Sequence, residues 1–216
     1  MDLFLLITEL IGTVSFAASG AVLGLRKRMD VFGVAIMGVI TACGGGVLRD
    51  LFLGKLPPVM FREPIYAMTA VGVSLLLFLP GMRRLLVTRE RAYELFSLVT
   101  DAVGLGVFTA AGVSAAFQAG YGDNLFFVVF LGSITGVGGG VLRDLLGGDR
   151  PYIFVKHIYA LASVAGAILC AGLWNVLGDA LAMILCCVLV FLIRLLAAHF
   201  RWSLPKADLP QLPGEN

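Results

Sequence analysis

Apolar residues along this chain form long runs that are separated by short polar or charged breaks. A helix of about 20 residues crosses a hydrocarbon core of about 30 Å. Runs of that order cover residues 4–24, 31–53, 65–81, 95–117, 125–147, 158–176 and 180–198. The pattern predicts an all-α integral membrane protein with seven transmembrane helices, or six if the weak break at 175–179 only kinks one long helix.

The composition agrees with a lipid environment. Apolar residues make up 59% of the chain and charged residues 14%, whereas a typical soluble domain is about 25% charged. The net charge of +2 does not suggest a nucleic-acid partner. The first run lacks a basic leader and contains Glu9, so we interpret it as a retained helix and not a cleaved signal peptide.

Lysine and arginine residues are divided unequally between the two sides of the predicted bundle. One side receives eleven of them: Arg26, Lys27, Arg28, Arg83, Arg84, Arg89, Arg91, Arg150, Lys156, Arg201 and Lys206. The other side receives Lys55 and Arg62. Because cytoplasmic loops carry the positive excess, the N-terminus is predicted outside and the C-terminus in the cytoplasm. The basic loop at 83–91 is expected to meet anionic lipid head groups, although orientation alone would account for it.

The chain repeats itself. Gly-Gly-Gly-Val-Leu-Arg-Asp occupies residues 44–50 and returns at 138–144, an offset of 94. A similar offset of 92 relates four further pairs upstream: Glu9 and Asp101, Gly12 and Gly104, Phe16 and Phe108, Gly20 and Gly112. Because each copy holds three helices, the second copy must enter the membrane inverted, an arrangement typical of transport paths at the interface between repeats.

The repeat divides the chain into four predicted parts. Residues 1–90 form the first three-helix repeat and residues 91–178 form the second, inverted one. Residues 179–202 form the seventh helix, and residues 203–216 form a disordered tail.

Three glycines in a row are unfavourable in a membrane helix, at about 1 kcal/mol each relative to alanine. They permit a kink or break, and non-helical backbone at membrane depth is tolerated only where protein buries it or water reaches it. We therefore expect the second and fifth helices to be broken beside a hydrated path, and close helix packing is the alternative for the glycines alone. The residues concerned are Gly44, Gly45, Gly46, Gly138, Gly139 and Gly140.

Ionisable residues inside membrane helices are rare, and they usually face a cavity or each other. The inversion places Glu9 and Arg49 toward the outer half and Asp101 and Arg143 toward the inner half, so we predict one ion pair within each repeat. With Asp50 and Asp144, four acids face two arginines. This excess would favour cations if all six groups are ionised, whereas protonation of a buried acid would remove it.

Three pairs of uncharged residues complete the candidate site. Thr41 and Thr135 precede the glycine triplets by three residues and either offer hydroxyl groups to an ion or bond their own helix. Two aromatic pairs are also repeated. They are Phe16 and Phe108, candidate gates or ordinary packing residues, and Tyr66 and Tyr159, expected as anchors at the membrane interface.

Motifs for catalysis or metal binding are missing from the sequence. The glycine runs lack the Lys-Ser/Thr of a phosphate-binding loop, and the sequence contains no His-Glu-x-x-His. The cysteines form no Cys-x-x-Cys pair and lie in apolar runs. They are Cys43, Cys170, Cys186 and Cys187. We therefore expect neither an enzyme nor a bound metal or cofactor.

The paired Gly-Gly-Gly-Val-Leu-Arg-Asp motifs and the order of three plus three plus one helices resemble the prokaryotic branch of the trimeric intracellular cation (TRIC) channels. Such sequences have also been labelled a glycine-transporter or uncharacterised membrane family. The resemblance covers about residues 5–198. It implies a homotrimer in the bacterial inner membrane in which each protomer holds its own pore, with K⁺ as the main permeant ion and Na⁺ as a second one. The Lys-Glu-Val element of eukaryotic members is absent, so their lipid and calcium regulation is not expected.

These observations together predict a potassium-permeable channel. A secondary transporter of a small zwitterion such as glycine is the alternative, because inverted repeats with broken helices suit alternating access equally well. A purely structural or assembly protein is a third class.

Overall fold

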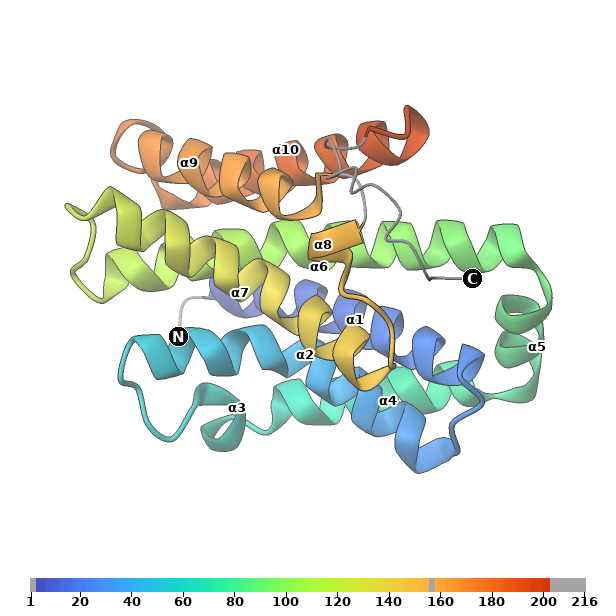
Figure 1. Ribbon diagram of the computed structural model, residues 1–216. Helices are drawn as coiled ribbons and strands as arrows, with labels where there is room; N and C mark the ends of the chain where they lie inside the picture. Colours follow the sequence, from blue (N-terminus) through green and yellow to red (C-terminus); the bar gives the residue numbers. More distant parts are fainter. Residues whose placement is uncertain (1–2, 156–157, 203–216) are drawn as a thin grey trace, which may run out of the picture.

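The computed structural model describes residues 3–155 and 158–202, and it folds them into a bundle of helices (Figure 1). Within this part of the chain, six helices are long and apolar enough to cross a membrane. They are α1 (Leu3–Arg26), α2 (Val31–Phe52), α6 (Glu90–Gln118), α7 (Leu125–Leu146), α9 (Tyr159–Leu177) and α10 (Asp179–His199). The bent pair of α4 (Ile65–Phe78) and α5 (Pro80–Thr88) makes a seventh if its two helices are counted as one span. The predicted all-α membrane fold is confirmed.

The third span departs most from the predicted pattern. α4 has 14 residues, which is about 21 Å at 1.5 Å per residue. The backbone leaves the helical region at Leu79 (φ −56°, ψ 143°), because the residue before a proline is disfavoured in helical geometry. The chain then turns by 79° into the next helix. The run predicted at 65–81 is therefore a shorter helix followed by one that leaves at a steep angle.

Two of the predicted breaks contain short helices. α3 (Val59–Arg62) and α8 (Tyr152–Val155) occupy equivalent places in the two repeats. The weak break at 175–179 is a real one, because Gly178 with φ +81° separates α9 from α10. The predicted disordered tail at 203–216 and Lys156 lie outside the described residues.

The helices pack in two equivalent groups. α1, α2 and α4 contact one another, and α6, α7 and α9 repeat this arrangement. The groups meet where α1 packs on α6 and α2 packs on α7, while α10 covers α6 and α9. α1 and α6 run in opposite directions, as do α2 and α7 (Figure 1). The second repeat is therefore inverted relative to the first.

α2 and α7 cross at their glycine triplets. A Cβ atom on Gly45 would overlap the carbonyl oxygen of Thr135, and one on Gly139 would overlap the carbonyl oxygen of Thr41. The two helix backbones thus touch directly, which only glycine allows.

The helical hydrogen bonding is not interrupted at the glycine triplets, and a bend of these helices there stays a prediction. α2 and α7 each run as a single helix through Gly44–Gly46 and Gly138–Gly140. The glycines are needed for the space they leave, not for an unusual backbone conformation. A continuous helix also keeps every backbone group bonded at membrane depth.

Replacing Gly139 with alanine should destabilise the protein by about 3 kcal/mol, the upper end for an overpacked core, because a backbone carbonyl cannot rotate away. Gly72→Ala is a matched control, since a Cβ there meets nothing within 4 Å. Thermal unfolding of the two detergent-solubilised variants measures the difference. Equal melting temperatures would contradict the role of the crossing.

Candidate functional site

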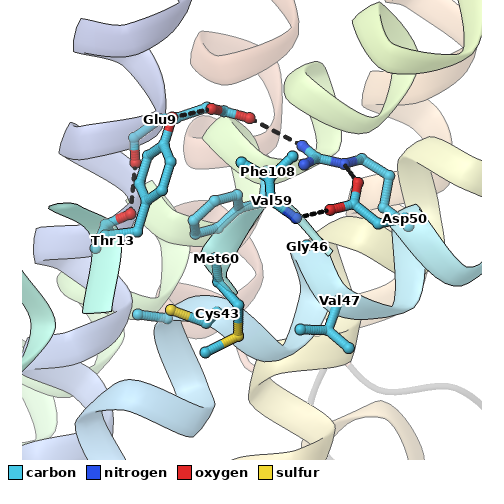
Figure 2. Close-up of a pocket in the computed structure, with 12 residues that line it drawn as sticks. Glu9, Thr13, Cys43, Gly46, Val47, Asp50, Val59, Met60 and Phe108 are labelled. Carbon is cyan, nitrogen blue, oxygen red and sulfur yellow. Dashed lines mark hydrogen bonds and ion pairs between the residues drawn. The ribbon is translucent and has the colours of Figure 1, made fainter. Parts of the chain in front are cut away.

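Four side chains of the first repeat form one cluster of hydrogen bonds and ion pairs (Figure 2). Arg49 Nη1 on α2 donates to Glu9 Oε1 on α1 at 2.8 Å. The hydroxyl group of Tyr66 on α4 donates to Glu9 Oε2 at 2.6 Å. Arg49 Nε also donates to Asp50 Oδ1 at 2.9 Å. The predicted Glu9–Arg49 pair is confirmed, and both carboxylate oxygens of Glu9 are hydrogen-bonded.

The second repeat forms the equivalent cluster at the opposite end of the bundle. Arg143 Nη1 donates to Asp101 Oδ1 at 2.6 Å, and its Nε donates to Asp144 Oδ1 at 2.9 Å. Arg143 also donates to the hydroxyl group of Ser19 on α1, so the first repeat contributes to this cluster. The arginine side chain is only 2% exposed. The predicted Asp101–Arg143 pair is confirmed.

The aspartate of each motif holds the loop that follows its helix. Asp50 Oδ2 accepts from the backbone N–H of Val59, and Asp144 Oδ2 accepts from that of Tyr152, both at 2.8 Å. These donors begin α3 and the α8 segment. Because the sequence did not predict those short helices, this role of the Arg-Asp motif was missed.

The sequence analysis expected the two tyrosines to be anchors at the membrane interface, but the structure buries both of them. Tyr66 is 6% exposed and Tyr159 is 2% exposed. Each hydroxyl group donates to the acid of its own repeat, at 2.6 Å to Glu9 and at 3.4 Å to Asp101. A Cβ on Gly140 would lie 2.7 Å from the Tyr159 hydroxyl oxygen. The last glycine of the second triplet therefore makes room for this tyrosine.

Arg194 of α10 joins the second cluster, although the sequence analysis did not single it out. Its side chain is buried, and Nη2 lies 4.0 Å from Asp101 Oδ2. The guanidinium group stacks over the Tyr159 ring at 4.7 Å. The sequence does contain a signal for this residue, because Arg194 is a lone arginine inside the apolar run at 180–198. Charged residues inside a membrane span are rare and usually functional. The four acids therefore face three buried arginines, not two.

The two threonines bond their own helices. The hydroxyl group of Thr41 donates to the carbonyl oxygen of Met37, and that of Thr135 donates to the carbonyl oxygen of Leu131, each at 2.6 Å. Both side chains are buried. The hydroxyl groups are thus engaged by the backbone, which is the second of the two roles predicted for them.

The two phenylalanines pack against each other where α1 crosses α6. The ring centroids of Phe16 and Phe108 are 5.3 Å apart. A Cβ on Gly12 would lie 3.1 Å from the Phe108 ring, and one on Gly104 would overlap the Phe16 ring. The glycines that precede each phenylalanine in the repeat therefore accommodate the ring from the other repeat. A gating role for the pair stays a prediction.

A cavity adjoins each charge cluster. The first-repeat cavity has a volume of about 150 Å³ and is lined by Glu9, Arg49, Asp50, Lys55 and Gln118, among others. A deeper pocket of about 30 Å³ leads from Glu9 to Phe108 (Figure 2).

The second-repeat cavity is larger, at about 550 Å³, and its lining includes Asp101, Arg194 and Arg91. α6 lines both cavities, through Asp101 at one end and Ala111 at the other. These positions are about 15 Å apart along the helix. Phe108 lies on this stretch of α6, and it lines the small pocket beside Glu9.

A metal centre is not evident in the residues that the structure describes. They contain no group of three or more His, Cys, Asp or Glu side chains placed to hold a metal ion. The four cysteines are free, and Cys43, Cys170 and Cys186 are buried.

Comparison with known proteins finds a matching family and similar bacterial membrane proteins. The family described as Glycine transporter matches residues 6–80 and 98–175, one segment in each repeat. The UPF0126 inner membrane protein YadS of Escherichia coli K12 is 38% identical over 206 residues, which cover 94% of this chain and 96% of that protein.

Two solved structures share the fold over nearly their whole length. A prokaryotic TRIC channel crystallised in 0.5 M KCl is 31% identical with a TM-score of 0.85, covering 94% of this chain and 100% of that chain. The TRIC trimeric intracellular cation channel orthologue from Rhodobacter sphaeroides is 32% identical with a TM-score of 0.83, covering 91% and 98%.

Replacing Arg143 with alanine should cost about 3–5 kcal/mol of stability, because it leaves buried acids without their counter-charge. Arg49→Ala should cost less, since Arg49 and Glu9 are more exposed, at 9% and 16%, than Arg143 and Asp101, at 2% and 1%. Folded yield and melting temperature of both variants test this order. Wild-type values in both would contradict the buried pairs.

Proposed function

This chain belongs to the Glycine transporter family and to the prokaryotic TRIC channel family, and we propose on that basis that it is a monovalent cation channel of the cell inner membrane. It is a multi-pass membrane protein and not an enzyme. Potassium is its main permeant ion, and sodium also passes. The protein acts as a homotrimer whose protomers each hold a pore between the inverted repeats.

The observation that carries this proposal is the pair of charge clusters at two cavities on either side of the repeat interface. In the first cluster, Glu9 and Asp50 face Arg49, which leaves a formal charge of −1. A negative site in a cavity with low-dielectric walls attracts cations. The cavity lining draws on both repeats, because Glu9 lies in α1 and Gln118 lies in α6.

Lipid is the second proposed partner. Arg28, Arg83 and Arg84 surround a surface cavity of about 530 Å³ at the bend between α4 and α5. All three are exposed, and the positive-inside rule places them at the cytoplasmic face. Anionic head groups suit such a basic site next to an apolar surface.

Single-channel recording of the purified protein in a planar bilayer tests the proposal. Under a KCl gradient we expect discrete openings whose currents reverse near the potassium potential, because the first-repeat cavity favours cations. Replacing potassium with sodium should leave a smaller current of the same sign.

A silent bilayer would contradict a channel. Saturable glycine uptake into liposomes by the same preparation would then identify a carrier, the activity that the family description names. Arg62→Gln is a suitable control for surface charge, since Arg62 is exposed and its Nε donates to the carbonyl oxygen of Pro57.

A further inference from the structure

The two charge clusters are equivalent in position but differ in charge. The first holds Glu9 and Asp50 against Arg49, a formal charge of −1. The second holds Asp101 and Asp144 against Arg143, and Arg194 brings it to zero. The extra arginine comes from α10, which lies outside the repeat, and in the described part of the chain Arg49 alone pairs with the acids of the first cluster. The seventh helix therefore removes the symmetry that the duplication created.

The acid in the second cluster has an oxygen that its own repeat does not satisfy. Glu9 uses Oε1 for Arg49 and Oε2 for Tyr66. Asp101 receives both Arg143 and the tyrosine of its repeat on Oδ1. Asp101 Oδ2 is buried and makes no hydrogen bond within the described residues. The shorter aspartate thus leaves one carboxylate oxygen available beside the second-repeat cavity, which Asp101 lines.

Arg194 is placed against that oxygen. Its Nη2 atom is 4.0 Å from Asp101 Oδ2, beyond hydrogen-bond distance but within reach of a strong charge interaction. The Tyr159 ring holds the guanidinium group from the other side, at 4.7 Å. An arginine near a helix end ordinarily extends its charged group to the membrane surface. Arg194 is only 3% exposed, so it is directed inward, to the wall of the cavity.

We propose that Arg194 is a tethered countercation at the second-repeat end of the ion path. Its guanidinium group takes the electrostatic place that a permeating cation would take beside Asp101 Oδ2. Arg194 therefore limits cation occupancy of the second-repeat cavity and sets how strongly the channel prefers cations over anions. This inference rests on the proposed channel function and assigns a selectivity role to a residue of the seventh helix.

Replacing Arg194 with methionine removes the charge and keeps a long side chain. The second cluster would then carry −1, like the first. We expect the single-channel potassium conductance to rise roughly twofold to tenfold at low salt, because removing a positive charge from the cavity wall raises the local concentration of cations. The reversal potential under a KCl gradient should move closer to the potassium potential. In 1 M salt, where the Debye length is about 3 Å, the conductance difference should shrink.

Two further variants separate charge from volume. Arg194→Lys keeps the positive charge and should stay near wild type. Arg91→Gln removes a charge from an exposed residue that lines the same cavity, and it should change the reversal potential much less than Arg194→Met. The reversal potential does not depend on the amount of protein, so a variant of low yield is still informative. Arg194→Gln provides a second neutral side chain if the methionine variant does not fold.

The outcomes are distinct. A silent wild-type protein would overturn the proposed channel function, and the role of Arg194 with it. Wild-type currents that both neutral variants leave unchanged would overturn the role of Arg194 alone. An equal rise in Arg194→Lys and Arg194→Met would show that side-chain volume matters and not charge, which also contradicts the proposal.

Discussion

The direct backbone contact between α2 and α7 is the constraint on which the rest of the structure depends. Gly45 and Gly139 bring each helix against a carbonyl oxygen of the other. Lipid supplies no hydrophobic drive between helices, so close packing at this crossing, together with the packing of α1 on α6, holds the two repeats together. Any side chain beyond hydrogen at these positions would push the repeats apart.

The crossing also places the charges. Arg49 and Arg143 each follow the contacting glycine of their helix by four residues, which is about 6 Å of helix. Since α2 and α7 run in opposite directions, the arginines lie on opposite sides of the crossing, about 12 Å apart along it. Each then meets the acid of its own repeat. The glycine crossing thereby separates the two charge clusters, and each cluster adjoins a cavity.

Periodicity and duplication were enough to predict the six long helices, the inversion and both ion pairs, because repeated residues must occupy equivalent sites. They could not distinguish a glycine that bends its own helix from one that lets another helix pack closely, since in both cases the sequence shows only a residue without a side chain. The buried positions of Tyr66 and Tyr159 depend on packing that no local pattern encodes, whereas the end of α4 at Leu79 follows from the proline after it. Arg194 lies outside the repeat, so duplication gives no sign of its role.

The central claim is that each protomer holds its own ion path between its two repeats. Crystals soaked in a rubidium salt test it directly, because anomalous diffraction locates this potassium substitute. The account predicts rubidium beside Glu9 and Asp50 in the first-repeat cavity of every protomer, because the cluster that these acids form with Arg49 has a formal charge of −1. Rubidium found on an axis between protomers, with none in these cavities, would contradict it.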